Sequence, residues 1–165
     1  MLAVEAEMKG LARHFEEDEN LWGLAGLLHD ADYELFKDDP KKHPSMIFTS
    51  LTEQNVNPQI IQAIKAHAWG WQDDAPEPQS KMDWALYTAD DLSGMIIACA
   101  LVRPDKKLTS VTVDSVLKKW PDRSFAKGVH REHIELCQPK LGISLSDFIN
   151  ICLESIKNIA PDLGL

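Results

Sequence analysis

Apolar residues at the start of the chain recur with the period of an α-helix. They are Leu2, Val4, Met8, Leu11 and Phe15. This spacing predicts an amphipathic helix. Asp18 is a candidate N-cap for a second helix that ends near His29. Gly23 and Gly26 in that helix carry no Cβ, so they permit a neighbouring helix to approach closely. The polar segment DADYELFKDDPKK that follows predicts a loop.

Proline and capping residues mark the starts of further helices. Pro44 suits the first turn of a third helix, and Asn57-Pro58 marks the start of a fourth. The segment WGWQDDAPEPQ is rich in proline and aspartate and predicts a loop. Ser80 is then expected to cap a long, largely apolar helix that runs to about Leu101. Such a helix is typical of the centre of a bundle.

The last third of the chain shows three more helical patterns. They lie near Val113–Trp120, Phe125–Cys137 and Ser144–Ile159. Ser144 and Asp147 open the last one in an arrangement that resembles a capping box. The strict alternation that strands require is nearly absent from the sequence. We therefore predict an all-α fold, a single domain over residues 1–165 built as a bundle of about seven to nine helices.

Composition narrows the class of protein. The chain has 44% hydrophobic and 26% charged residues, which is ordinary for a soluble globular protein. No apolar run approaches the roughly 18 residues that a membrane span needs, and the N-terminal segment carries acidic residues. We expect a cytoplasmic protein without a membrane partner, either a monomer or a homodimer. Cys99, Cys137 and Cys152 form no CxxC pair and are expected to be reduced interior residues.

The charge of the chain argues against one class of partner. The formal net charge is −9, whereas extended binding to DNA or RNA depends on phosphate neutralisation by Lys and Arg. No extended nucleic-acid contact is therefore expected. A small phosphorylated ligand remains compatible with this charge, because bound metal ions can dominate the field inside one pocket.

His29-Asp30 is the first candidate for chemistry. The pair follows the apolar segment LWGLAGLL, and imidazole and carboxylate are ligands that divalent cations share. Asp90 lies within the long apolar helix, where an ionised carboxylate is costly unless a cation compensates it. His43 and His67 also lie beside apolar residues at helix ends. Each residue alone is consistent with a structural role. Together they can converge as a metal site in a helical bundle.

The ordered set of these residues resembles the HD-domain superfamily of metal-dependent phosphohydrolases. The resemblance rests on HD, then HP, then a histidine that ends an IxxIxxH helix, then an aspartate in an apolar helix. The segments LAVEAEMKGLARHF, LWGLAGLLHDADYE, ALYTADDLSGMI and SFAKGVHRE further resemble a bacterial group of small HDIG-type predicted hydrolases. The resemblance covers nearly the whole chain. It implies an all-α fold and hydrolysis of a small phosphate ester such as a nucleotide.

The resemblance also implies roles for particular residues. The implied metal ligands are His29, Asp30, His43, His67 and Asp90. They would hold one or two divalent ions (Fe, Mn, Mg, Co, Ni or Zn), and Asp30 would bridge two of them. Asp30 and Glu34 are the candidate catalytic residues. Glu34, Asp32 and Glu5 are each either a solvated surface acid or a group that supports the ligands or accepts a proton. Lys81 and Arg131 are candidates for binding the substrate phosphate. Trp69 and Trp71 either pack in the interior or line the pocket, and we favour packing.

One feature departs from the family pattern. The family's first metal-binding histidine would fall immediately before Met1, and His14 lies too far along the helix to replace it. Either the true start of the protein lies upstream or the first metal site is altered, and we favour the former. Two alternatives to a phosphohydrolase therefore stay open. One is a regulatory module that binds metal or ligand without catalysis. The other is a di-iron oxygenase of the HD type.

Overall fold

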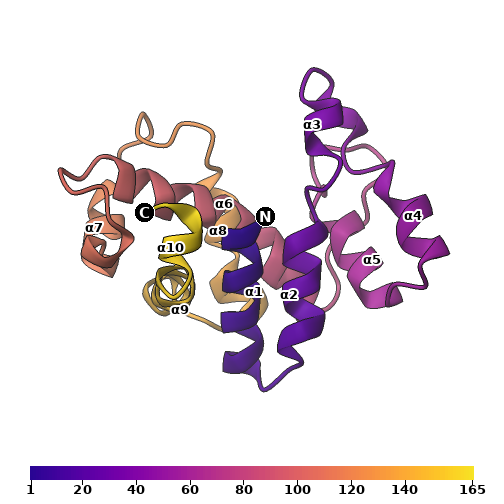
Figure 1. Ribbon diagram of the computed structural model, residues 1–165, viewed down its shortest axis with the longest axis horizontal. Helices are drawn as coiled ribbons and strands as arrows, with labels where there is room; N and C mark the ends of the chain where they lie inside the picture. The colour runs from indigo at the N-terminus through magenta and orange to yellow at the C-terminus, as the bar shows by residue number, and fades with distance from the viewer.

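The computed structural model describes residues 1–165, apart from the side chain of Pro40, and it is built from helices (Figure 1). No strand occurs in this described part of the chain. Seven α-helices have seven or more residues, while α3 (Tyr33–Phe36), α8 (Arg131–Ile134) and α10 (Ala160–Leu163) are single turns of four. The all-α prediction is confirmed.

Helices α1 (Leu2–Phe15) and α2 (Glu19–Leu28) form an antiparallel pair at the centre of Figure 1. The Asp18 side chain accepts hydrogen bonds from the backbone N–H groups of the next turn, as its predicted capping role requires. At Gly26 a Cβ would lie only 2.7 Å from the carbonyl oxygen of Val4. The predicted close approach of the two helices therefore depends on this glycine.

Helix α6 (Lys81–Leu101) is the long central helix, and it contacts α1, α5 (Pro58–Ala66), α8 and α9 (Leu145–Lys157). Ser80 and Asp83 form a capping box at its start. Most of its residues from Met82 to Ala100 are buried, which fits the predicted central position. Helices α7 (Val113–Lys119), α9 and α10 lie on the left of Figure 1, after the 3₁₀ turn η2 (Leu108–Ser110).

The right-hand side of Figure 1 holds α3, α4 (Ile47–Glu53) and α5, and here two predictions need correction. The expected loop after His29 contains α3 and the 3₁₀ turn η1 (Pro40–Lys42). Pro44 lies before α4 instead of in its first turn. The reason is a tertiary contact: the Asp32 carboxylate accepts hydrogen bonds from the backbone N–H groups of residues 45, 46 and 47, and so fixes where α4 begins.

The helix expected over Phe125–Cys137 is also corrected. The structure has turns before α8, and a π-helical segment η3 (Cys137–Leu141) after it. Side chains compete here for the backbone groups that a helix would pair. Asp122 accepts from the N–H groups of Ser124 and Phe125, and Arg131 donates to the carbonyl oxygens of Asp122 and Phe125. These bonds hold the segment in a non-helical form.

The three cysteines, Cys99, Cys137 and Cys152, are free and buried in the interior, as predicted. Within the described residues, no helix combines the length and the apolar character that crossing a membrane requires.

Candidate metal centre

A pocket of about 530 Å³ lies beside α6, and it is lined by side chains that can bind metal. Asp30, His43, His67 and Asp90 form one part of its lining, and Asp91, His130 and His133 form another. The aromatic residues of the lining are Tyr33, Trp71 and Tyr87. Helices distant in sequence therefore bring histidines and carboxylates to one solvent-accessible hollow.

His29 occupies the C-cap of α2 and is fully buried. Its Nδ1 is hydrogen-bonded to the carbonyl oxygen of Gly26 at 2.7 Å. Its Nε2 lies 3.2 Å from Oδ1 of Asp90 and 3.3 Å from Oδ2 of Asp30. The helix end thus aims one ring nitrogen at two carboxylates.

The other oxygen of Asp30 faces two further histidines. Oδ1 of Asp30 lies 2.9 Å from Nε2 of His43, which in turn lies 3.3 Å from Nε2 of His67. His67 is the C-cap of α5, and its Nδ1 is bonded to the Ile64 carbonyl oxygen at 2.5 Å. Asp30 is therefore shared between two donor sets, one with His29 and Asp90 and one with His43 and His67.

Asp32 orients His43 from behind. Its Oδ1 lies 2.6 Å from Nδ1 of His43, while its Oδ2 accepts from the backbone N–H groups at the start of α4. Burial opposes ionisation of Asp32, but the N–H of Ser45 and the His43 imidazole outweigh it and lower its pKa. An ionised carboxylate behind an imidazole is the usual support of a metal-binding histidine.

The hydrogen bonds fix which ring nitrogen of each histidine is free. A carbonyl oxygen only accepts, so Nδ1 of His29 and of His67 must carry the proton, and the ionised Asp32 demands the same of His43. In the neutral rings all three Nε2 atoms are then acceptors, and two of them face each other at 3.3 Å. A positive charge between the two acceptors, from a metal ion or from a proton, stabilises this arrangement.

The separations agree with metal ligation. Ligand atoms about 2.1 Å from an ion lie roughly 3.0 Å apart in octahedral and roughly 3.4 Å apart in tetrahedral geometry. The contacts of Nε2 of His29 and His43 span 2.9 to 3.3 Å. The donor set of nitrogen and carboxylate oxygen suits several divalent ions. The residues therefore fit the metal ions that the resemblance implies.

The charges of the cluster favour a cation. Burial opposes protonation of His29, but the Asp90 and Asp30 carboxylates outweigh it and raise its pKa to about 10. Burial also works against ionisation of Asp30, yet His29 and His43 hold its pKa well below the ordinary value. Burial and the neighbouring His29 lower the pKa of His67 to about 4. The carboxylates thus stabilise positive charge at His29, which a divalent ion can supply in place of the proton.

Three predicted site residues lie elsewhere. Glu34 is exposed on α3 and is not among the residues that line the pocket. Arg131 is buried, donates to backbone carbonyl oxygens and lies over the Trp120 ring. Lys81 lies over the ring of Phe15 and lines a different hollow, which it shares with Trp22. The structure therefore does not bring these three residues to the metal cluster.

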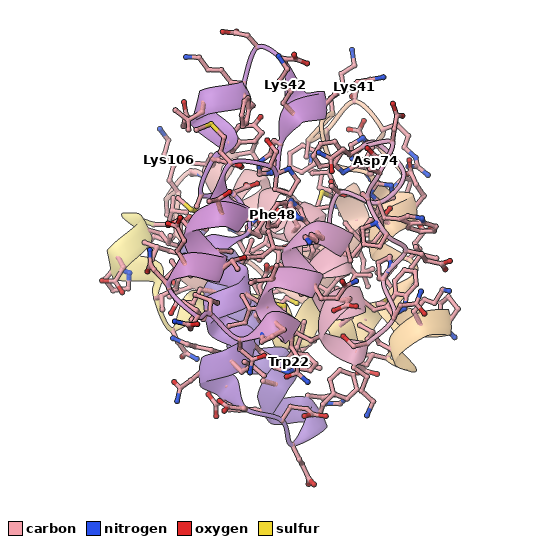
Figure 2. All side chains as sticks on the ribbon, turned by 90° about the vertical axis from the view of Figure 1, so that its right-hand side faces the viewer. Trp22, Lys41, Lys42, Phe48, Asp74 and Lys106 are labelled. Atoms are coloured by element: carbon pink, nitrogen blue, oxygen red, sulfur yellow. The ribbon has the colours of Figure 1, made fainter. Side chains whose placement is uncertain are left out.

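Figure 2 shows where two neighbours of these hollows lie. Trp22 lies in the lower part of the molecule, whereas Lys41 and Lys42 of η1 lie near the top. Gln72, which follows Trp71 of the pocket, donates to the Lys41 carbonyl oxygen, so η1 adjoins the pocket rim. Trp22 lines the hollow of Lys81, which is therefore a different hollow from the one beside η1.

The two tryptophans after His67 have different surroundings. Trp69 packs against Trp84 and Tyr87, with ring centroids 5.8 and 5.6 Å apart. Trp71 stacks nearly parallel to His43, at 5.9 Å and 15°, and is 36% exposed in the pocket wall. Packing, which the sequence favoured for both, describes Trp69 alone.

Glu7 is a buried acid that the sequence did not single out. It lies on the inner face of α1, and neither carboxylate oxygen has a hydrogen-bond partner among the described residues. Burial and the nearby Asp90 raise its pKa well above the ordinary value. The sequence did contain a signal for this burial, because Glu7 lies four residues after Ala3 on an apolar face of the predicted helix.

A second cluster was also missed. Asp91 turns toward His130 and His133, and its oxygens lie 3.3 and 3.0 Å from their Nδ1 atoms. The HxxH spacing of the two histidines, which places them on one face of a short helix, was the signal in the sequence.

The comparison with protein families agrees with the geometry. The HD domain family model matches residues 1–95, a span that contains all five of the clustered ligands named above. The chain belongs to the HD domain family, a class largely made up of metal-dependent hydrolases. Comparisons with curated proteins and with solved structures gave no significant match.

Proposed function

We propose that this protein is a metal-dependent phosphohydrolase that acts on a nucleotide or another small phosphate ester. The observation that carries the proposal is the sharing of Asp30 between two three-residue donor sets in an open pocket. Such a pair of adjacent sites suits the clamping of a phosphoryl group between two ions. Family membership supports the same class of reaction.

In this proposal each donor set would hold one divalent ion, and Asp30 would belong to both sets. Bound ions supply neutralisation of phosphate charge and activation of a water nucleophile. His29 and Asp90 complete one set, and His43 and His67 complete the other. Water adds to phosphorus as the ester P–O bond breaks, giving an alcohol and inorganic phosphate. Glu34 has no part in this proposal.

The residues around the ions serve to orient them. Asp32 keeps the proton of His43 on Nδ1 and thereby leaves Nε2 available as a ligand. The backbone carbonyl oxygens of Gly26 and Ile64 do the same for His29 and His67. The chain thus contributes fixed ligand geometry instead of a covalent nucleophile.

The pocket wall supports a substrate with a flat, apolar part. Trp71 and Tyr33 each contact His43, Trp71 by stacking and Tyr33 edge-on with centroids 5.5 Å apart. Both side chains are also open to solvent, so a ring of the substrate can pack on them beside the metal ligands. A nucleoside phosphate joins such a ring to a phosphate.

A phosphatase panel tests the proposal. Metal-free protein is reloaded with Mn²⁺, Co²⁺, Ni²⁺, Zn²⁺ or Fe²⁺, the iron under anaerobic conditions, and phosphate release from nucleotides and sugar phosphates is measured. We expect release that depends on metal and is lost in Asp30→Ala and Asp90→Ala. Asp39→Ala is the matched control, because Asp39 is an exposed acid that forms an ion pair with Lys42 and does not line the pocket.

The same preparation separates the two alternatives. Tight metal binding without turnover under any metal would replace the proposal with a regulatory role. An iron-loaded protein that consumes oxygen and shows a mixed-valence signal would replace it with an oxygenase. Activity that survives in both aspartate variants would place the chemistry outside this cluster.

A further inference from the structure

Asp91 has an environment of its own, separate from the five ligands of the candidate centre. It follows Asp90 on α6, so its side chain is turned by about 100° around the helix axis. Its Oδ2 lies 3.0 Å from Nδ1 of His133, and its Oδ1 lies 3.3 Å from Nδ1 of His130. Two consecutive aspartates therefore face two different histidine clusters.

The two histidines are arranged as a pair. Their rings stack with centroids 4.9 Å apart and 28° between the planes. The backbone N–H of His130 also donates to Oδ1 of Asp91 at 2.9 Å, which fixes the start of α8 against α6. The Tyr87 ring packs on His133 at 4.8 Å. Both imidazoles are thus oriented by contacts from another helix.

We propose that Asp91, His130 and His133 form an additional binding site for a divalent transition-metal ion of the Zn²⁺ class. The ligands would be the two Nδ1 atoms and the Asp91 carboxylate. One potential ligand atom from each residue, a ring nitrogen or a carboxylate oxygen, lies within 4.8 Å of the others. The two Nδ1-to-oxygen separations, 3.0 and 3.3 Å, fall in the range expected for neighbouring ligands of one ion.

The surroundings favour a cation over an anion at this place. The pocket that contains the cluster is lined by three carboxylates, those of Asp30, Asp90 and Asp91. Among the residues described as lining it, none is a lysine or an arginine. Without bound metal ions these carboxylates would repel a free phosphate, whereas they attract a divalent ion. Two imidazoles and one carboxylate are also a donor set that zinc and its neighbours accept.

The exposure of the three residues leaves room for other ligands. The Asp91 and His133 side chains are 16% and 26% exposed, whereas His130 is 60% exposed. An ion here would therefore keep positions open for water or for a group of the substrate, as catalytic sites do and closed structural sites do not. The test of this site does not depend on the proposed hydrolysis, because the metal content of the protein is measured without any substrate.

Metal stoichiometry tests the inference. Protein is equilibrated with Zn²⁺ at buffered free concentrations, and bound zinc per chain is measured by mass spectrometry. We expect the double variant His130→Ala/His133→Ala to bind one equivalent fewer than the wild type. His14→Ala, an exposed histidine on α1, is the matched control and should bind the wild-type number. Equal zinc content in the wild type and the double variant would overturn the inference.

A second measurement needs no substitution and so does not depend on the folding of a variant. The ring ¹⁵N signals of His130 and His133 are followed by NMR during a Zn²⁺ titration of the wild-type protein. Ligation through Nδ1 would place the remaining ring proton on Nε2 in both residues. Ring signals of these two histidines that stay unchanged up to zinc saturation would also overturn the inference.

Discussion

Replacement of Asp32 by asparagine is expected to weaken metal binding through His43. In the native chain the carboxylate accepts from Nδ1 of His43 and from the N–H groups of Ser45, Met46 and Ile47. An asparagine that keeps its oxygen toward the backbone donors must turn its NH₂ group toward His43. The imidazole then has to accept at Nδ1, so its proton moves to Nε2 and the ligand atom is blocked.

The size of both effects follows from the charged hydrogen bond that this substitution replaces with a neutral one. The fold becomes less stable by about 1 to 2 kcal/mol, because a hydrogen bond to a charged acceptor contributes more than a neutral one. For a domain of this size that corresponds to a fall in Tm of about 2 to 8 °C. Removal of such a support behind a ligand lowers metal affinity by roughly 10- to 100-fold. Both effects are large enough to measure.

The assay is a competition titration with a chromophoric chelator, accompanied by thermal unfolding of the metal-free protein. Asp83→Asn is the matched control. Asp83 is also a buried carboxylate that accepts backbone N–H groups, but it does so in the capping box at the start of α6. It should lose stability and keep its metal affinity. Wild-type affinity in Asp32→Asn would refute the role given to Asp32.

Three further outcomes are expected. Gly26→Ala should lower Tm by roughly 2 to 10 °C, because the new Cβ would lie 2.7 Å from the carbonyl oxygen of Val4. Gly94→Ala is the control: its Cβ would lie 3.5 Å from Cγ2 of Val129, so it should raise Tm slightly in the same unfolding assay. Without metal the pKa of His29 is about 10, so metal binding at pH 7 should release about one proton from this residue. Metal affinity should therefore fall as the pH falls. Calorimetry in buffers of different ionisation enthalpy measures the proton release. Arg131→Met should lower Tm by roughly 5 to 15 °C, because it removes the two hydrogen bonds to the carbonyl oxygens of Asp122 and Phe125. The substitution should leave KM for a phosphate ester unchanged. A raised KM would instead favour the substrate-binding role of Arg131.

Local signals in the sequence predict much of the fold. Asp18, Asn57 and Ser80 cap the helices that they were expected to start, because capping depends only on residues within one turn. The region after Asp122 was not predictable in this way. Its backbone is held by Arg131 and Asp91, which lie 9 and 39 residues from the groups they bind. Helical periodicity carries no information about such contacts.

The candidate site, like the fold, could be predicted from the sequence only in part. The HD pair and the three other candidate ligands were predicted because family resemblance and apolar surroundings both point to them, and the HD domain match covers all five positions. Asp32 was noted as one acid near the site, but its bond to His43 depends on how the chain folds back after α3. The placement of Lys81 away from the pocket depends on which end of α6 faces the metal cluster. Neither fact is contained in the spacing of residues.

The proposed function depends on Asp30 joining two metal positions. Electron paramagnetic resonance of protein loaded with Mn²⁺ measures this, because ions that share a carboxylate are close enough for their spins to couple. We expect an exchange-coupled signal in the wild type that is lost in Asp30→Ala and retained in Asp39→Ala. A wild-type spectrum of isolated Mn²⁺ ions alone, or a coupled signal that persists in Asp30→Ala, would contradict it.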